Sequence, residues 1–233
     1  MSAANRARAR RLASQYLDQN DPLGWFEVLY STANGDSRSI SWADMLANPN
    51  LLSWLEREEM DTSGKKAIII GCGLGDDAEA LSQRGFDVVA FDISKTAIQW
   101  CKTRFPDSSV RYVTADLFRP PSSWTSVFDL VVEVYTLQVL PAKIRQVAIE
   151  RIAHLVAPGG KIIVISRGRE PQENPGRMPW PLTQRELSFF KTQGLMEISF
   201  EDFLDQEDPP VRRFRGVYKR NTVNPPQYGD ILP

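Results

Sequence analysis

Three glycines at alternate positions form the most informative short motif of the 233-residue chain. They occur in residues 70–75, Ile-Gly-Cys-Gly-Leu-Gly, between a β-branched run and a predicted helix. Glycine has no Cβ, so such a turn lets a ligand lie against bare backbone. The spacing is G-x-G-x-G, whereas a dinucleotide-binding turn usually reads G-x-G-x-x-G and holds a pyrophosphate at the helix N-terminus. The following helical turn carries three carboxylates, which disfavour a pyrophosphate and tolerate a positively charged ligand: Asp76, Asp77 and Glu79.

Two aspartates that follow the next two apolar runs have the chemistry to bind a nucleoside. Asp92 ends the run 88–91, 17 positions after Gly75, where a carboxylate can accept hydrogen bonds from both hydroxyls of a ribose. Asp116 follows the run 110–114 and can accept a hydrogen bond from an adenine amino group. Each aspartate alone could instead be a turn former, because aspartate favours strand ends. Together with the glycines, the two acids favour a nucleoside-containing ligand.

Glu133 and Tyr135 follow the fourth apolar run and are the candidate catalytic residues. Glu133 is predicted to lie at the carboxyl end of a strand beside the cleft, where it could contact the ligand, bind a substrate or remove a proton. Tyr135 could orient a nucleophile or pack in the core. His154, the only histidine, is predicted in the last turn of a helix, where it interacts favourably with the helix dipole. We therefore assign no catalytic role to His154.

The elements that must position these residues alternate between short apolar runs and amphipathic helices. Such runs are buried on both faces, as in a parallel sheet. Near the end of the chain, 197–203 and 213–219 are two predicted strands, and Arg212, Arg213 and Arg215 are expected to alternate outward from an edge strand. This order predicts an α/β fold with a doubly wound, mostly parallel, seven-stranded sheet and a helical N-terminal cover. We divide the chain into a helical lid segment (1–60), the sheet domain (61–222) and a C-terminal tail (223–233).

The overall composition limits the classes of partner. The chain has 28 Lys and Arg against 29 Asp and Glu, a net charge of −1, whereas nucleic-acid-binding proteins usually have a basic excess. No apolar run approaches the roughly 18 residues that cross a bilayer. Cys72 and Cys101 form neither a disulfide framework nor a zinc spacing and fit a reducing cytoplasm. We expect a small-molecule partner, no nucleic acid and no membrane. The arginine-rich start is interpreted as a basic first helix, with a transit peptide as the alternative: Arg6, Arg8, Arg10 and Arg11.

Residues 66–166 resemble the class I methyltransferases, which depend on S-adenosylmethionine (SAM). The resemblance rests on the glycine loop, Asp92, Asp116 and the segments 128–133 and 155–160. It implies that 61–222 is a SAM-binding methyltransferase domain. The family often has an acid where this chain has Ile70, so we expect no direct contact from that position to the methionine ammonium. The cofactor-binding residues implied by the resemblance are Gly71, Cys72, Gly73, Gly75, Asp92, Ile93, Asp116, Leu117 and Glu133.

From Trp25 onward the chain is also similar to the thiopurine, thiol and halide S-methyltransferase branch. This similarity implies a small-molecule acceptor, a thiol or another soft nucleophile, which can attack a sulfonium without a strong base. Trp25 or Trp42 could lie over the sulfonium through cation–π attraction, or simply pack the lid. The matching segments are Trp25, 42–44, 48–52, 133–141 and 178–183.

Three other functions are consistent with parts of the sequence. A nicotinamide-dependent reductase would need a proton donor such as Tyr-x-x-x-Lys, and no tyrosine has a lysine four positions later. A SAM-binding module without catalysis would keep the cofactor site and have a blocked cavity. An oxygen or nitrogen methyltransferase would need a general base, for which Glu133 is the candidate.

Overall fold

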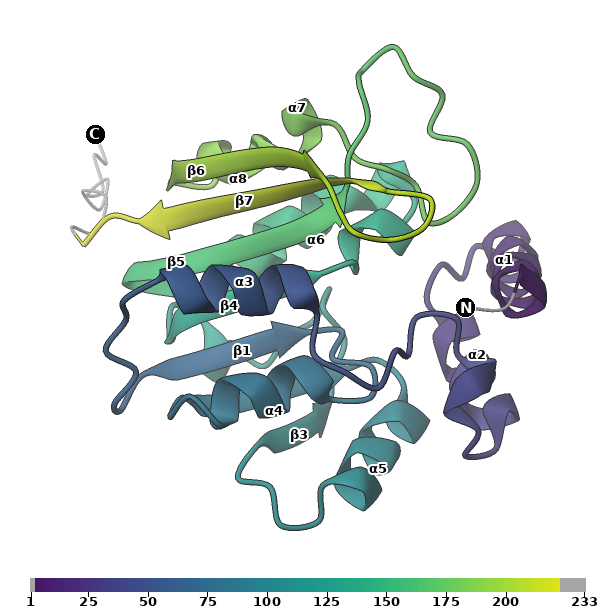
Figure 1. Cartoon of the computed structure of the whole chain (residues 1–233), viewed down its shortest axis with the longest axis horizontal. Helices are drawn as coiled ribbons and strands as arrows, with labels where there is room; N and C mark the ends of the chain where they lie inside the picture. The colour runs from purple at the N-terminus through teal and green to yellow at the C-terminus, as the bar shows by residue number, and fades with distance from the viewer. Residues whose placement is uncertain (1–2, 223–233) are drawn as a thin grey trace, which may run out of the picture.

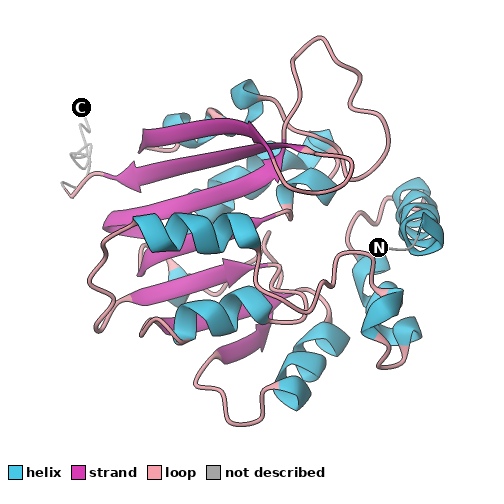
Figure 2. Ribbon diagram, viewed as in Figure 1, coloured by secondary structure: helices cyan, strands magenta, loops and turns pink. Residues whose placement is uncertain are grey.

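The computed structural model describes residues 3–222, a seven-stranded sheet with helices on both faces (Figures 1 and 2). The strands are β1 (Lys66–Ile70), β2 (Asp87–Asp92), β3 (Arg111–Thr114), β4 (Phe128–Val134), β5 (Val156–Arg167), β6 (Leu195–Leu204) and β7 (Arg212–Arg220). The α-helices are α1 (Ala3–Asp18), α2 (Gly24–Ala33), α3 (Pro49–Arg57), α4 (Asp76–Ser82), α5 (Lys95–Arg104), α6 (Ala142–Leu155), α7 (Gln184–Leu187) and α8 (Phe189–Thr192). Three 3-10 turns are η1 (Ser37–Ser39), η2 (Ser122–Trp124) and η3 (Leu137–Val139).

The strand order is β3-β2-β1-β4-β5-β7-β6. Strand β1 pairs in parallel with β2 and β4, β2 with β3, and β4 with β5, whereas β7 is antiparallel to both β5 and β6. The predicted doubly wound, mostly parallel sheet is therefore confirmed. The expected outward alternation of the arginines is wrong, because β7 lies inside the sheet. Arg213 and Arg215 are buried, and each is ion-paired, Arg213 with Asp205 and Arg215 with Glu201.

Alternate residues of the central strands serve two cores, one on each face of the sheet. Ile68 and Ile70 of β1 pack with α6, whereas Ala67 and Ile69 pack with α3, α4 and α5. This two-sided burial explains why the strands read as continuous apolar runs rather than alternating ones. With both faces covered, the carboxyl ends of the strands become the place where polar side chains can meet a ligand.

Helices α1 and α2 lie beyond the carboxyl ends of the parallel strands (Figure 1). Their buried residues form a third cluster with Leu74 of the glycine loop, Ala97 of α5 and Met178. Helix α3 belongs instead to the core of one sheet face, through its stripe of Leu51, Trp54 and Leu55. The described part of the predicted lid, residues 3–60, thus contains two packing units, of which α1 and α2, with the turns that follow them, cover the strand ends. We call this unit, residues 3–47, the cover.

The tail assigned to 223–233 lies outside the described residues. Between residues 3 and 222, no helix combines the length and the apolar character needed to cross a membrane.

Candidate active site

The glycine loop joins β1 to α4, and its backbone needs glycine for two different reasons. A Cβ at Gly71 would lie 2.5 Å from Thr136 Oγ1, and one at Gly75 would lie 2.6 Å from the Tyr112 hydroxyl. At Gly73 the nearest atom is the Tyr30 hydroxyl of the cover, 3.1 Å away. Gly71 and Gly75 therefore permit packing within the domain, and Gly73 leaves the backbone bare toward the cover. All three have positive φ: +60° at Gly71, +54° at Gly73 and +94° at Gly75.

The three carboxylates at the start of α4 are all engaged within the protein. Asp76 pairs with Arg104 at 2.8 Å, Asp77 Oδ1 accepts the Asn48 N–H at 2.6 Å, and Glu79 Oε1 accepts the Ser108 and Tyr112 hydroxyls at 2.6 Å each. The expectation that these carboxylates tolerate a cationic ligand is not tested by these internal contacts and stays a prediction. Their role is to fix the helix start against α3, α5 and β3.

Asp92 ends β2 with its carboxylate against the glycine loop and only 6% of the residue exposed. Its Oδ2 accepts the Gly73 N–H at 3.0 Å, and its Oδ1 accepts the Ser94 N–H at 2.9 Å. Burial raises the pKa of Asp92 to about 6, against the opposing effect of these two hydrogen bonds. A carboxylate offers about four acceptor sites, so both oxygens keep acceptor capacity. The geometry therefore suits the predicted contact with two ribose hydroxyls.

The other predicted adenosine contacts lie in the loops after β2 and β3. Asp116 is partly exposed, and its Oδ1 accepts the Phe118 N–H at 2.8 Å, as a turn former does. Its other carboxylate oxygen has no hydrogen bond among residues 3–222. Ile93 is also partly exposed, whereas Leu117 is 8% exposed and packs in the core beside α6. Asp116 and Ile93 thus keep surface for a ligand, and Leu117 is mainly a core residue.

Cys72 contributes its backbone to the loop. Its N–H donates to the Phe91 carbonyl at 2.9 Å, which ties the loop to the end of β2. Burial, followed by the hydrogen bond with Cys101, raises the pKa of the Cys72 thiol well above its usual range. The thiol is therefore protonated at neutral pH, and Cys72 is no nucleophile.

Glu133 is completely buried near the end of β4. Its Oε1 accepts the N–H groups of Thr136 at 2.6 Å and Leu137 at 2.9 Å, which closes the turn after the strand. Its Oε2 has no hydrogen-bond partner in the described part of the chain. Burial raises the pKa of Glu133 to about 7, against the effect of the two hydrogen bonds. Glu133 therefore holds the turn. Burial gives its carboxyl a pKa suited to a general base but also closes the free oxygen off from solvent.

Tyr135 occupies a strained position in this turn, with φ at +65°, which is rare for a bulky residue. Its hydroxyl lies 3.5 Å from Asn50 Nδ2, and the Arg213 guanidinium lies 4.7 Å from its ring centroid. The next residue, Thr136, donates from Oγ1 to the Ile70 carbonyl at 3.2 Å. The strained turn therefore links the glycine loop to the β7 side of the sheet.

Trp25 and Trp42 lie in one aromatic cluster of the cover. Trp25 is 1% exposed and stacks on Phe26 with ring centroids 3.9 Å apart. This burial favours core packing over a cation–π contact at Trp25. Trp42 is only partly buried, and its Nε1 donates to the Tyr30 hydroxyl at 2.9 Å. Tyr30 thus places its hydroxyl between Trp42 and Gly73. No sequence motif marks Tyr30 as a site residue, and its one signal is the buried helical face that it shares with Trp25 and Leu29.

Glu27 of α2 fastens the cover to the sheet domain. Its carboxylate accepts the Ser94 hydroxyl at 2.7 Å and the Thr96 N–H and hydroxyl at 3.1 and 2.5 Å. Desolvation would raise the pKa of Glu27, but the hydrogen bonds from Thr96 and Ser94 outweigh it and lower the pKa. Because Ser94 follows Asp92 by two positions, this contact joins the cover to the predicted ribose site.

Glu27→Ala is expected to lower the free energy of unfolding by about 1–3 kcal/mol, because the variant leaves partly buried donors at the start of α5 without their acceptor. Chemical denaturation measures this loss, and limited proteolysis of the cover measures its release. Glu56→Ala is the matched control, since Glu56 is exposed on α3. Equal stabilities of the two variants would contradict the proposed fastening role.

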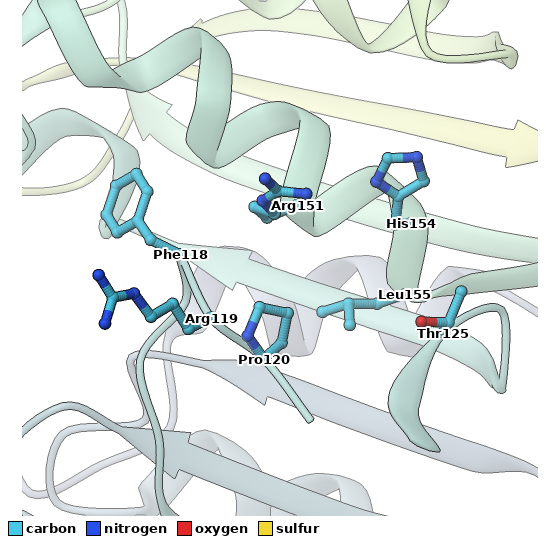
Figure 3. Close-up of a pocket in the computed structure, with 7 residues that line it drawn as sticks. All are labelled: Phe118, Arg119, Pro120, Thr125, Arg151, His154 and Leu155. Carbon is cyan, nitrogen blue, oxygen red and sulfur yellow. The ribbon is translucent and has the colours of Figure 1, made fainter. Parts of the chain in front are cut away.

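A separate hollow of about 420 Å³ lies at the amino ends of β4 and β5 (Figure 3). Arg151 and His154 of α6 line it together with Arg119 and Thr125. The His154 carbonyl accepts the Ser126 N–H at 2.7 Å, just before β4 begins. This hollow is therefore at the opposite end of the strands from the glycine loop, and His154 is remote from the candidate active site, as its predicted helix-end position implies.

The glycine loop, Asp92 and the turn after β4 converge at the carboxyl ends of adjacent strands, and comparison with known proteins identifies the arrangement. Residues 68–160 match the family described as a methyltransferase domain. Residues 68–160 form a methyltransferase domain. The matched residues of this methyltransferase domain run from β1 into β5 and include the glycine loop, Asp92, Asp116 and Glu133. The predicted enzyme class, with SAM as the cofactor of this class, is therefore confirmed at the level of the domain.

Curated relatives and solved structures are similar to parts of this chain. The ubiquinone biosynthesis O-methyltransferase of Stutzerimonas stutzeri is 30% identical over 129 residues, which cover 54% of this chain and 53% of that protein. The chain thus spans about half the length of the curated relatives that it matches. The N-methyltransferase NodS of Bradyrhizobium japonicum, in complex with S-adenosylhomocysteine (SAH), has a TM-score of 0.65 at 18% identity and covers 82% of this chain and 98% of that chain. A structure concerned with conversion of a disulfide bond into a thioacetal group during echinomycin biosynthesis has a TM-score of 0.68 at 16% identity, with coverage of 85% and 92%. Both structures share the fold of the methyltransferase domain.

Proposed function

We propose that the chain is a SAM-dependent methyltransferase that acts on a small-molecule acceptor. The observation that carries this proposal is the placement of Asp92, whose buried carboxylate is held against the bare backbone of Gly73 and keeps acceptor capacity on both oxygens. Asp116 and Ile93 add accessible surface on the adenosine side. When bound, SAM supplies an electrophilic methyl group on a sulfonium. The protein residues then need to bind, align the acceptor and exclude water, with little acid–base work.

The acceptor that we propose first is a thiol or another soft nucleophile that attacks as its own anion. The support is the burial of Glu133: its Oε1 holds the turn and none of its surface is exposed, so no accessible protein base lies at the end of β4. A thiol ionises near neutral pH and needs no such base. In its narrower form, the proposal is that the chain acts like the thiopurine, thiol and halide S-methyltransferases that it resembles in sequence.

An oxygen acceptor is the second candidate, favoured by a separate observation. Several relatives are ubiquinone biosynthesis O-methyltransferases. A hydroxyl acceptor gains from proton removal, and the pKa of Glu133, raised by burial to about 7, matches that task. In this case a small movement of the turn would have to expose Glu133 Oε2.

Glu133→Gln distinguishes the two acceptors and is our prediction for this site. The variant keeps the side-chain shape and removes the base. With a thiol we expect less than a tenfold loss of rate, and a rate that rises with pH along the ionisation of the thiol itself. A base typically contributes about 10²–10⁴ in rate, so an oxygen acceptor predicts a loss of that size and a rate that tracks a group near pH 7.

The measurement is transfer of labelled methyl from SAM to a panel of thiols, halides, phenols and amines, with wild-type protein and with Glu133→Gln. His154→Gln is the control and should leave the rate unchanged, because His154 lies at the opposite end of the strands. Transfer to no member of the panel would contradict the proposed function and favour a non-catalytic SAM-binding module.

Two features of the chain support a small molecule in the cytoplasm. The near-neutral charge supports a small-molecule acceptor over nucleic acid. The free cysteines, Cys72 and Cys101, support a reducing compartment.

A further inference from the structure

We infer that the acceptor carries a carboxylate and that Arg167 binds it. This inference rests on the proposed function and specifies its substrate class. Arg167 is the last residue of β5, at the same edge of the sheet as Asp92 and Glu133. Its position gives it a cationic group beside the turn that holds Tyr135.

Hydrogen bonds hold the backbone of Arg167, whereas its side chain forms none within the described residues. Its N–H donates to Gln138 Oε1 at 2.7 Å, and its carbonyl accepts the Leu182 N–H at 2.9 Å. The guanidinium is partly buried and has no hydrogen bond or ion pair within residues 3–222. Nearby arginines differ, because Arg169 donates to four carbonyls around it and Arg213 pairs with two carboxylates. A partly desolvated arginine with five free donors is costly unless a ligand uses it.

The charges around Arg167 leave room for one added negative charge. Arg167 and Arg213 are directly opposite in the β5–β7 register, and like charges in such pairs are destabilising. Asp205 and Glu207 both pair with Arg213 and form no ion pair with Arg167, so these two carboxylates and the arginines Arg167, Arg213 and Arg6 sum to one net positive charge. Desolvation lowers the pKa of Arg167, the charges of Arg213 and Arg6 lower it further, and Glu207 and Tyr135 oppose them. The charge of Arg6, an exposed residue of α1, also acts on Arg167, so part of the arginine-rich N-terminal helix adds to the positive potential.

A continuous set of contacts connects Arg167 to the glycine loop. Thr136 meets Gly71, and the neighbouring Tyr135 ring lies under the Arg213 guanidinium, which is opposite Arg167. An acceptor bound at Arg167 therefore lies against the turn that borders the cofactor loop. One free guanidinium matches a single negative charge, and its planar fork matches the two oxygens of a carboxylate.

The test uses two pairs of probes that differ only in charge: 3-mercaptobenzoate with 3-mercaptobenzamide, and 3-hydroxybenzoate with 3-hydroxybenzamide. Calorimetry measures their binding to SAH-saturated protein, without turnover. We expect the carboxylates to bind at least tenfold more tightly than the amides. Arg167→Ala should weaken carboxylate binding by about 10- to 100-fold, the scale of charge-assisted hydrogen bonds, and change amide binding by less than twofold.

Arg177→Ala is the matched control, because it removes the same charge from an exposed position in the loop after β5. Arg167→Lys should retain part of the carboxylate preference. The comparison of carboxylate with amide binding in the wild-type protein tests the inference even if a variant fails to fold. Equal binding of carboxylates and amides, no binding of either carboxylate, or an equal loss in Arg177→Ala would overturn the inference. Protein that fails to bind SAH would instead contradict the proposed function, so the two failures are distinguishable.

Discussion

Replacing Asp92 by alanine is expected to weaken SAM binding by about 2–4 kcal/mol, or roughly 30- to 1000-fold. The variant removes the acceptor proposed for both ribose hydroxyls, and hydrogen bonds to a charged group contribute about 1.5–3 kcal/mol each, partly offset by water. Calorimetric titration of wild-type protein and Asp92→Ala with SAM measures the difference. An unchanged dissociation constant in a folded variant would refute the assignment of Asp92.

Asp92 also holds the N–H groups of Gly73 and Ser94, so Asp92→Asn is the necessary control. Asparagine keeps one acceptor oxygen and the size of the side chain, and it removes the charge. Because burial raises the pKa of Asp92 to about 6, the ionised form predominates above that pH. SAM affinity of the wild type should therefore fall as the pH drops through about 6, and Asp92→Asn should lose this dependence.

Gly71→Ala is expected to destabilise the fold by about 2–5 kcal/mol. Left-handed backbone costs a non-glycine residue about 1–2 kcal/mol, and overpacking adds about 1–3 kcal/mol. The added Cβ would lie 2.5 Å from Thr136 Oγ1, which also bonds to the Ile70 carbonyl and cannot move without losing that contact. Denaturant unfolding measures the loss, and SAM binding should be lost with it.

Gly64→Ala separates the two contributions, because Gly64 has φ at +67° and nothing within 4 Å of an added Cβ. This control should lose only the backbone contribution, about 1–2 kcal/mol. Adding Thr136→Ala to Gly71→Ala should restore part of the stability, since it removes the clashing oxygen. Equal losses in Gly64→Ala and Gly71→Ala, with no rescue, would show that the Gly71–Thr136 approach is unimportant.

The fold could be predicted from the sequence because its signals are local. The runs in β1, β2 and β4 are β-branched and buried on both faces, so they read as parallel strands without any knowledge of their partners. The glycine loop and Asp92 stand at fixed distances from those runs, and the strand order brings them to one edge. The edge-strand expectation for Arg213 was wrong because the order of the last two strands in the sheet is a property of tertiary pairing.

The parts of the site that could not be predicted depend on contacts between distant segments. Tyr30 reaches Gly73 only because α2 docks on the glycine loop, and a tyrosine on a buried helical face gives no sign of that. Glu133 is predicted from the sequence to lie beside the cleft and contact the ligand or substrate, but the N–H groups of its own turn use one oxygen and burial leaves the other unpaired. The unpaired state of Arg167 emerges only when the partners of all the arginines around it are known.

The central claim is that the carboxyl edge of this sheet binds SAM, and direct calorimetric titration tests it. Wild-type protein should bind SAM and SAH saturably, while NAD should give no heat of binding. The reason is that α4, which follows the glycine loop, begins with carboxylates, and these disfavour a pyrophosphate at the helix N-terminus. Binding of NAD without binding of SAM would contradict the account.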